Sequence, residues 1–362
     1  VRCTRFPRMT ALERLRDAGI RRVRAGKGFT YRTARNGPVA GAQLPRIRKL
    51  AIPPAWTDVF VAPSASAKLQ AIGKDKAGRW QYRYHPRFRA RQDRRKFQKL
   101  VDFADALPRM RRRVAHDIRT RGLGQAKVMA CAIRVLSTCF MRPGSDEYAR
   151  RHRHYGLTTI RRQHVTVKGE LVTFDYPGKS GQRQHAEIRD RSVSRIVRQM
   201  LKLPGTELFK FLSEDGAVVD VKREHLNDYI KGVMGADFTA KDFRTWAGTL
   251  ICACALARVA ENDPELVAAA ARSKGRAGRT SKRAVRKTVV EAVKETAAEL
   301  GNTPAVARNS YIEPSVLSSF EKGEVVEKFF DTVEELVEHE KPTLAEPEKA
   351  LKELLETSAE PP

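Results

Sequence analysis

Long apolar runs are absent from this 362-residue chain, and none approaches the roughly 20 residues that a membrane-spanning helix requires. Charged residues make up 31% of the chain, which argues against a membrane protein, so we expect no membrane partner. The basic segment 1–10 is followed by no apolar stretch and is not typical of a signal peptide. Hydrophobic residues still reach 41%, enough for packed cores, and a chain of this length is typical of two domains.

Cysteine is also scarce: the chain has five, an odd number, and no two are spaced as CxxC. Four of them lie in apolar, helix-like stretches, where thiols behave as small core residues; they are Cys131, Cys139, Cys252 and Cys254. The usage therefore predicts neither disulfides nor a cysteine-bound metal ion. It is typical of a protein of the reducing cytoplasm.

Acidic residues are few, which makes net charge the strongest signal in the composition. Lys and Arg number 70 against 42 Asp and Glu, giving a net charge of +28. Residues 321–362 carry 13 acidic and 5 basic side chains, a net −8, so the preceding 320 residues carry +36. Such a body repels itself unless it binds a polyanion, and nucleic acid is the abundant one in cells. Charge alone leaves open an enzyme acting on nucleic acid or a ribosomal or chromatin-type protein without chemistry.

Paired carboxylates of the kind that hold catalytic metal ions in nucleases and polymerases are lacking as well. The adjacent acids Asp146 and Glu147, and Glu224, have no spaced partners that resemble a metal cage. His152 and His154 form an HxH pair, but on a basic loop without further ligands. We therefore predict no metal site and no cofactor, and phosphate chemistry that depends on side chains alone.

The first hundred residues predict a small, strand-rich mixed domain. Short β-prone runs at 29–31, 59–61 and 80–84 are separated by Gly, Pro and Asp turns. The sequence then changes character near 106–113, where Ala-Leu-Pro precedes the basic run RMRRR. We place a domain boundary there and predict an N-terminal domain at 1–107, a second domain at 108–320 and an acidic C-terminal tail at 321–362.

The second domain is expected to be mainly helical and to carry a small antiparallel sheet. Helices are predicted at 127–140, 191–203, 222–234, 243–260 and 281–300. Alternating runs at 164–167 and 171–174 flank a turn at 168–170, and a second turn follows at 177–181. Gly301 would end the last helix, and Thr303-Pro304 would begin another, with Tyr311 two turns inside it. We expect 271–283 to be a basic loop and the last twenty residues to be loose. The fold class is therefore α+β in two domains.

Metal-free transfer at a phosphodiester needs a nucleophile that forms a stable ester, cations that neutralise the transition state, and an acid for the leaving alkoxide. Tyrosine suits the first role. Arginine suits the second because its planar fork binds two phosphate oxygens and stays protonated. Lysine suits the third, since nearby arginines lower its pKa.

Separated segments of the chain carry such residues in a fixed order. They read RIRKLAIPPAWT at 46–57, QYRYH at 81–85, FMRPGSDEYA at 140–149, YGLTT at 155–159, GKSG at 178–181, KDFRTW at 241–246, GNTP at 301–304 and NSYI at 309–312. Over roughly residues 20–320 this set resembles the bacterial, poxvirus-like type IB DNA topoisomerases. The resemblance implies the fold shared by those enzymes and the tyrosine recombinases, and a catalytic role for the second domain.

The resemblance also implies a role for each matching residue. Tyr311 would be the nucleophile, Arg142 and Arg244 the phosphate-binding arginines, and Lys179 the general acid. Asn302 would bind the phosphate where many relatives have histidine, and it carries no charge. The DNA contacts would be Gln81, Tyr82, Tyr84 and Lys241.

The implied reaction is relaxation of supercoiled duplex DNA through a 3′-phosphotyrosyl intermediate, without ATP or metal, by a monomer in the cytoplasm whose residues 1–107 clamp the DNA. A tyrosine recombinase is the nearest rival. It usually has an HxxR box where this chain has KDFR at 241–244. A non-catalytic nucleoid protein would explain the charge but not the ordered motifs.

Overall fold

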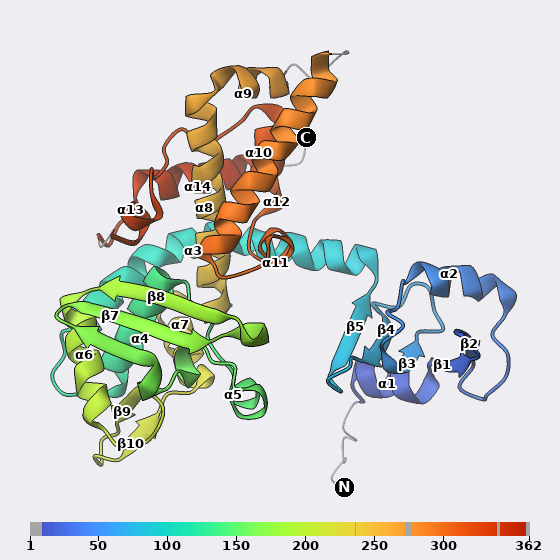
Figure 1. Cartoon of the computed structure of the whole chain (residues 1–362), viewed down its shortest axis with the longest axis horizontal. Coiled ribbons are helices and arrows are strands. Elements are labelled where there is room, and N and C mark those ends of the chain that lie inside the picture. The colour runs from blue at the N-terminus through green and yellow to red at the C-terminus, as the bar shows by residue number, and fades with distance from the viewer. Residues whose placement is uncertain (1–8, 236, 272–276, 339–340, 360–362) are drawn as a thin grey trace, which may run out of the picture. The chain divides into compact units, whose positions relative to one another are not determined.

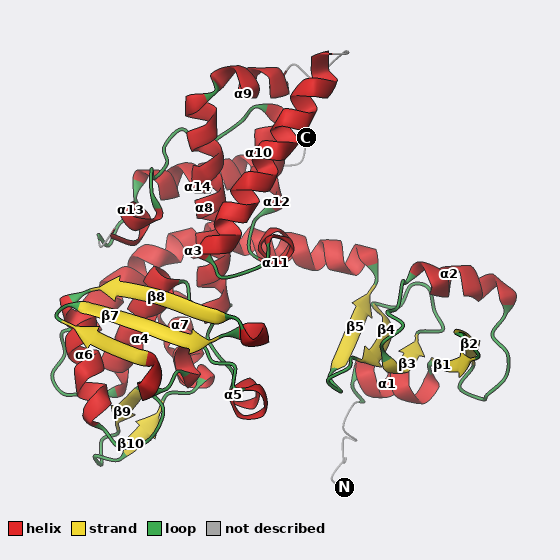
Figure 2. Ribbon diagram, viewed as in Figure 1, coloured by secondary structure: helices red, strands yellow, loops and turns green. Residues whose placement is uncertain are grey.

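A computed structural model describes residues 9–235, 237–271, 277–338 and 341–359, and divides the chain into two compact units between Lys96 and Phe97 (Figure 1). The first unit is rich in strands, and the second is mainly helical with a small sheet (Figure 2). The predicted α+β class is therefore confirmed. None of the helices within the described ranges has the length and apolarity needed to cross a membrane.

The first unit is built on a five-stranded antiparallel sheet in the order β2-β1-β3-β4-β5. Its strands are β1 (Ile20–Ala25), β2 (Gly28–Arg32), β3 (Thr57–Val61), β4 (Leu69–Lys74) and β5 (Trp80–Tyr84), and its short helices are α1 (Ala11–Ala18) and α2 (Leu44–Lys49). All three predicted strands are present. Val61, Ala71 and Ile72 are fully buried in the core of this unit, and β5 lies at one edge of the sheet.

The second unit combines helices with two small antiparallel sheets. The helices are α3 (Pro86–Asp117, which begins in the first unit), α4 (Gln125–Cys139), α5 (Asp146–His152), α6 (Arg191–Lys202), α7 (Arg223–Met234), α8 (Ala240–Asn262), α9 (Pro264–Ala271), α10 (Ala277–Glu299), α11 (Pro304–Ser310), α12 (Pro314–Lys322), α13 (Val333–Glu338) and α14 (Glu346–Ala359). The sheets are β6 (Val165–Lys168), β7 (Leu171–Pro177) and β8 (Arg183–Arg189), and the pair β9 (Lys210–Leu212) and β10 (Val218–Asp220).

Helix α8 is the central element of this unit. Every residue from 243 to 257 is buried, because α8 is surrounded by α4, α10, α12 and α14. A helix that is apolar on all sides belongs in such a position. The predicted hairpin between β6 and β7 is also confirmed, with Gly169 in the left-handed conformation that the turn requires.

The predicted domain boundary differs from the division in the structure. Residues 107 and 108 lie inside α3, which continues through Pro108. Proline usually breaks a helix because it lacks an N–H donor. Here buried side chains on both sides of the proline, among them Phe103, Leu107 and Met110, hold α3 against the core.

The expectation that the last twenty residues are loose is wrong up to residue 359, and 360–362 lie outside the described residues. Helix α14 packs on the second unit, with Leu351 fully buried and Glu348 only 3% exposed. The Arg111 guanidinium donates to both carboxylate oxygens of Glu348, at 2.9 and 2.8 Å, and Lys352 pairs with Asp105 at 2.7 Å. Helix α14 is ordered because its apolar side chains pack on the core and two ion pairs join it to α3.

Two local predictions also need correction. Helix α10 already begins at Ala277, so the second half of the predicted 271–283 loop is helical, while 272–276 lie outside the described residues. Tyr311 caps the C-terminal end of α11 rather than lying inside a helix. The backbone of Tyr311 is not helical, so the direction of its side chain is set by contacts with neighbouring elements and not by the turn of α11.

Candidate active site

Arg142 reaches the site through the loop after α4. Phe140 ends that helix with a left-handed backbone (φ 47°), and Arg142 follows two residues later. Its Nη2 donates to the carbonyl of Gly301 at 2.9 Å and to Oδ1 of Asn302. The first predicted arginine and the predicted phosphate-binding asparagine, 160 residues apart in sequence, are therefore in direct contact.

Arg244 lies on the first part of α8 and is 2% exposed. Its Nη2 donates to the carbonyl of Leu300 at 2.8 Å, and its Cζ lies 4.9 Å from the centroid of the Tyr311 ring. Burial lowers the pKa of Arg244, but a guanidinium stays protonated in proteins. The two arginines thus hold the consecutive carbonyls of Leu300 and Gly301.

Two buried donors at this place have no acceptor among the described residues. They are Nε of Arg244 and Nδ2 of Asn302. Buried polar groups are normally paired, so an unpaired donor needs a physical explanation. Since Oδ1 of Asn302 already accepts from Arg142, its Nδ2 is a buried donor without a partner among the described residues.

Tyr311 is half-buried, and its phenol lies in a cationic environment. Its main chain is fixed by a hydrogen bond from its N–H to the carbonyl of Ala307 (2.9 Å) and by the hydroxyl of Thr249, which donates to its carbonyl (3.1 Å). Burial by itself would raise the pKa of Tyr311. The charge and hydrogen bond of Arg244, with the charges of Arg142 and Lys241, outweigh burial and lower that pKa. A depressed pKa is what an activated nucleophile requires.

The other tyrosine close to both arginines is Tyr176, and its environment has the opposite effect. It is 5% exposed, and burial raises its pKa to about 12. It lines a separate cavity of about 190 Å³ behind the arginines. Geometry and pKa therefore favour Tyr311 over Tyr176 as the nucleophile.

Tyr311 and Arg142 also line a cavity of about 470 Å³, here called the reaction cavity. Its other lining residues are Pro143, Gly144, Ser145, Tyr148, His154, Tyr155, Lys179, Arg223, Asn227, Thr239 and Lys241. Lys179 is exposed in the short turn between β7 and β8, where the hairpin was predicted, and Lys241 is exposed at the start of α8. Four predicted site residues thus line one cavity: Arg142, Lys179, Lys241 and Tyr311. Arg244 and Asn302 are not among its lining residues, but Arg244 contacts Tyr311 and Asn302 contacts Arg142.

Two family models match this chain. A family model described as the eukaryotic DNA topoisomerase I catalytic core matches residues 85–338, and one described as the bacterial DNA topoisomerase IB N-terminal domain matches 28–75. A DNA topoisomerase 1B from Acanthamoeba polyphaga mimivirus is 33% identical over 300 residues, which cover 81% of this chain and 85% of that protein. The chain belongs to the type IB DNA topoisomerase family. The resemblance inferred from the ordered motifs is confirmed.

Two solved structures of the site-specific recombinase XerH bound to difH substrate, a pre-cleavage and a post-cleavage complex, are also similar to this topoisomerase. Both are 12% identical, with TM-scores of 0.29 and 0.31, and cover 66% and 68% of this chain. The match spans 55% and 58% of those recombinase chains, little more than half their length. Similarity at TM-scores this low supports no conclusion about function.

The predicted DNA contacts in the first unit of the topoisomerase lie on both faces of β5. Tyr82 and Tyr84 share a face, are 43% and 41% exposed, and stack with ring centroids 6.2 Å apart. Gln81 lies on the opposite face, since side chains alternate along a strand, and its amide donates to Asp75 at 2.9 Å. The structure brings the two tyrosines together but not Gln81.

Asp146 and Glu147, two of the acids considered as metal ligands, are paired with basic residues in the topoisomerase. Asp146 pairs with Lys222 at 3.2 Å, and Glu147 pairs with Arg151 at 3.0 Å. The rings of His152 and His154 stack 5.8 Å apart. Within the described ranges, no three His, Cys, Asp or Glu side chains gather in a group that could hold a metal ion.

Sequence reasoning missed the residues that seat Tyr311 against α8. A side-chain carbon added to Gly248 would lie 2.9 Å from the Tyr311 carbonyl oxygen, 3.1 Å from its Cβ and 2.9 Å from Leu300. The hydroxyl of Thr249 accepts from the N–H of Glu313 at 3.2 Å as well as donating to the Tyr311 carbonyl. No sequence pattern marks these two residues, because their roles come from close approach to Tyr311 and Leu300, which are distant in the chain.

We expect replacement of Gly248 by alanine to slow DNA cleavage by on the order of 10- to 100-fold, because small displacements of a reacting group are costly. The added methyl group must displace the Tyr311 main chain or Leu300, at a cost of about 1–3 kcal/mol in stability. Single-turnover cleavage and thermal unfolding measure the two effects. The matched control is Gly232→Ala in α7, where an added carbon meets nothing within 4 Å. Equal rates for the two variants would contradict this role of Gly248.

Proposed function

We propose that this topoisomerase relaxes supercoiled duplex DNA by cutting and rejoining one strand, with Tyr311 as the nucleophile. The observation that carries the proposal is the cationic environment of Tyr311. Burial would raise the pKa of this phenol, yet the nearby arginines and Lys241 lower it. A depressed tyrosine pKa in a cavity lined by further cations is suited to attack on a phosphodiester.

In the cleavage step, the Tyr311 hydroxyl oxygen bonds to phosphorus and its proton leaves to solvent. The bond from phosphorus to the 5′ oxygen breaks, and Lys179 donates a proton to that oxygen. The products are a 3′-phosphotyrosyl ester and a 5′-hydroxyl. In the reverse step the 5′-hydroxyl returns its proton to Lys179, attacks the ester and releases Tyr311. The ester conserves the bond energy, so no ATP is needed.

Transition-state charge would be balanced by donors that are already in place. The Arg142 guanidinium lines the reaction cavity and is suited to a non-bridging oxygen. The buried, unpaired Nε of Arg244 and Nδ2 of Asn302 lie next to Tyr311 and Arg142 and would join it once bound DNA opens the site to them. Preorganised donors of this kind stabilise developing charge without reorganisation during the reaction. Asn302 contributes a neutral donor, which is weaker than a charged one.

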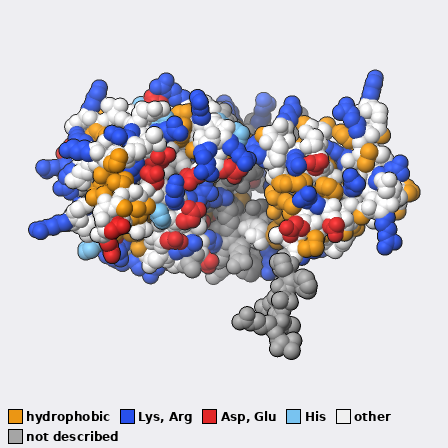
Figure 3. Space-filling view, turned by 90° about the horizontal axis from the view of Figure 1, so that it is seen from below, with side chains coloured by type: hydrophobic (Ala, Val, Ile, Leu, Met, Phe, Trp, Pro, Cys, Tyr) orange, Lys and Arg blue, Asp and Glu red, His pale blue; other side chains and the backbone are white. Residues whose placement is uncertain are grey.

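Duplex DNA is the proposed partner because both units present basic surface. Figure 3 shows Lys and Arg side chains spread over the visible face of each unit, with Asp and Glu side chains among them. The exposed Tyr82 and Tyr84 would contact DNA from the first unit, and the exposed Lys241 would contact it beside the reaction cavity. Gln81 would have to leave Asp75 before it could contact a base.

The test is relaxation of a supercoiled plasmid in excess EDTA without ATP, with denaturant added to trap covalent protein–DNA adducts. We expect relaxation at a rate within about twofold of that in Mg²⁺, because side chains rather than a metal would neutralise the phosphate. The adduct should be attached to the 3′ side of the nick. Gel mobility of the plasmid and labelled ends of the trapped strand give both answers.

The outcomes separate this function from its rivals. Strand exchange between two duplexes without relaxation of one circle would indicate recombination instead. Salt-sensitive binding with no trapped adduct would indicate a DNA-binding protein without chemistry. Loss of relaxation in EDTA, restored by Mg²⁺, would contradict the metal-free mechanism.

A further inference from the structure

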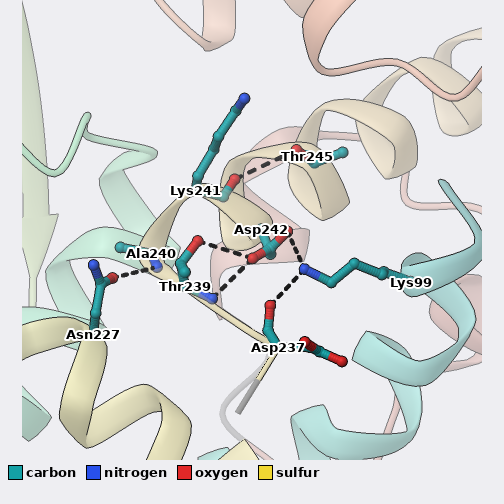
Figure 4. A network of polar contacts seen from close by, with 8 residues as sticks. All are labelled: Lys99, Asn227, Asp237, Thr239, Ala240, Lys241, Asp242 and Thr245. Carbon is teal, nitrogen blue, oxygen red and sulfur yellow. Dashed lines mark hydrogen bonds and ion pairs between the residues drawn. The ribbon is translucent and has the colours of Figure 1, made fainter. Parts of the chain in front are cut away.

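The first turn of α8 carries Lys241 and precedes Arg244, and it is held by a network of polar contacts (Figure 4). Asp242 Oδ2 accepts from the N–H of Thr239 at 2.8 Å and from its hydroxyl at 2.9 Å, which caps the helix. Asn227 accepts from the N–H of Ala240 at 3.1 Å. These contacts satisfy N–H groups that a helix start leaves unpaired.

Lys99 of α3 joins this network from outside α8. Its Nζ donates to the carbonyl of Asp237 at 2.5 Å and lies 3.5 Å from Oδ1 of Asp242. Figure 4 shows Lys99 and Asp242 facing one another, while the Lys241 side chain extends away from them. Lys99 therefore bridges the segment before α8 and its first turn, and its amine is already bound to two protein oxygens.

Aromatic packing continues the contact between α3 and α8 one turn further along. Phe103, fully buried, lies 5.0 Å from Phe243, 5.7 Å from Phe238 and 6.0 Å from Trp246, measured between ring centroids. Lys99 and Phe103 are four residues apart and so lie on one face of α3. The aromatic cluster fixes the middle of the contact between α3 and α8. Lys99 fixes the end of that contact, at the first turn of α8, which carries Lys241.

We propose that Lys99 is a positioning residue for DNA cleavage: it holds the first turn of α8 so that Lys241 stays in the reaction cavity and Arg244 stays at the Tyr311 ring. The inference rests on the proposed function of those residues. In a protein with this many lysines and arginines, an exposed basic side chain usually serves to attract or contact DNA phosphates. Lys99 differs because it is only 30% exposed and is paired with Asp242, which is 16% exposed.

The experiment compares Lys99→Met, which keeps an apolar stem over Phe238 but removes the charge, with Lys99→Arg, which can restore the pair. We expect single-turnover cleavage by Lys99→Met to be slowed on the order of 10- to 100-fold, with the Kd for DNA changed by less than about twofold. Lys99→Arg should recover to within about threefold of the wild-type rate. Asp242→Asn should slow cleavage similarly, and the double variant should be no slower than either single one.

The matched control is Arg112→Met, which removes a charge from an exposed position of the same helix. It should leave the cleavage rate unchanged. If Lys99→Met instead weakens DNA binding and lowers the salt slope by about one, Lys99 contacts a phosphate and the proposal is wrong. A loss confined to the fraction of active molecules, with an unchanged rate, would indicate a merely structural role and would also overturn it. Failure of the proposed function is distinct, because the wild-type protein would then form no adduct.

Discussion

Replacement of Tyr311 by phenylalanine is expected to abolish both plasmid relaxation and covalent capture of DNA. The change removes one oxygen atom and leaves the ring that packs against Arg244 and the cluster of Phe140, Ala247 and Leu300. Without the phenol no ester can form, so residual cleavage should be at least about 10⁴-fold slower. Denaturant-trapped adduct on a labelled duplex measures the loss directly, and a DNA-binding assay should show an unchanged Kd.

Tyr176→Phe is the matched control for that variant. Tyr176 also lies near Arg142 and Arg244, but it is buried and its pKa is raised to about 12. We expect Tyr176→Phe to relax DNA within about threefold of the wild-type rate, since only a buried hydroxyl outside the lining of the reaction cavity is lost. An adduct that survives Tyr311→Phe and disappears in Tyr176→Phe would reverse the assignment of the nucleophile.

Replacement of Lys179 by alanine is expected to slow cleavage by on the order of 10²–10⁴-fold, the usual contribution of a general acid. The loss should depend on the leaving group. A substrate with sulfur in place of the bridging 5′ oxygen expels a thiolate, which needs no proton, so the variant should cleave it at nearly the wild-type rate. Rapid-quench measurement of both substrates with both proteins gives four rates to compare.

Lys168→Ala is the control for this second experiment, because Lys168 is an exposed lysine at the other hairpin of the same sheet. It should cleave both substrates like the wild-type protein. If the sulfur substrate fails to rescue Lys179→Ala, then Lys179 acts through its charge on the phosphate and not as a proton donor. Equal loss in Lys168→Ala would show that general basicity of the sheet matters instead.

Local patterns predicted several of the elements correctly. The strands β2, β3 and β5, the hairpin of β6 and β7, and helices α4, α6, α7 and α8 follow from apolar periodicity and from turn residues such as Gly169. Errors arose where long-range packing overrode local signals. Helix α3 continues through Pro108, and α14 is ordered by the pairing of Arg111 with Glu348, 237 residues away. No local pattern encodes such a pairing.

The residues of the candidate site also fall into those that the sequence identified and those that only the structure reveals. The order of motifs supplied Arg142, Lys179, Arg244, Asn302 and Tyr311, and the structure brings these five residues together. The order of motifs could not supply Gly248, Thr249 or Lys99, because their importance lies in close approach to residues distant in the chain. A glycine in an apolar helix or a lysine among 70 basic residues carries no distinguishing signal in sequence.

The sequence by itself determined the basic body, the α+β class and the residue types that serve metal-free phosphate chemistry, because composition and periodicity are local properties of the chain. Only the tertiary structure decided which hydrogen-bond donors meet which acceptors. It places Oδ1 of Asn302 at Arg142 and leaves its Nδ2 unpaired, and it sets Arg244 at the ring of Tyr311. The lowered pKa of Tyr311 follows from that assembly, because a charge acts on a phenol through distance and burial, which the order of residues does not specify.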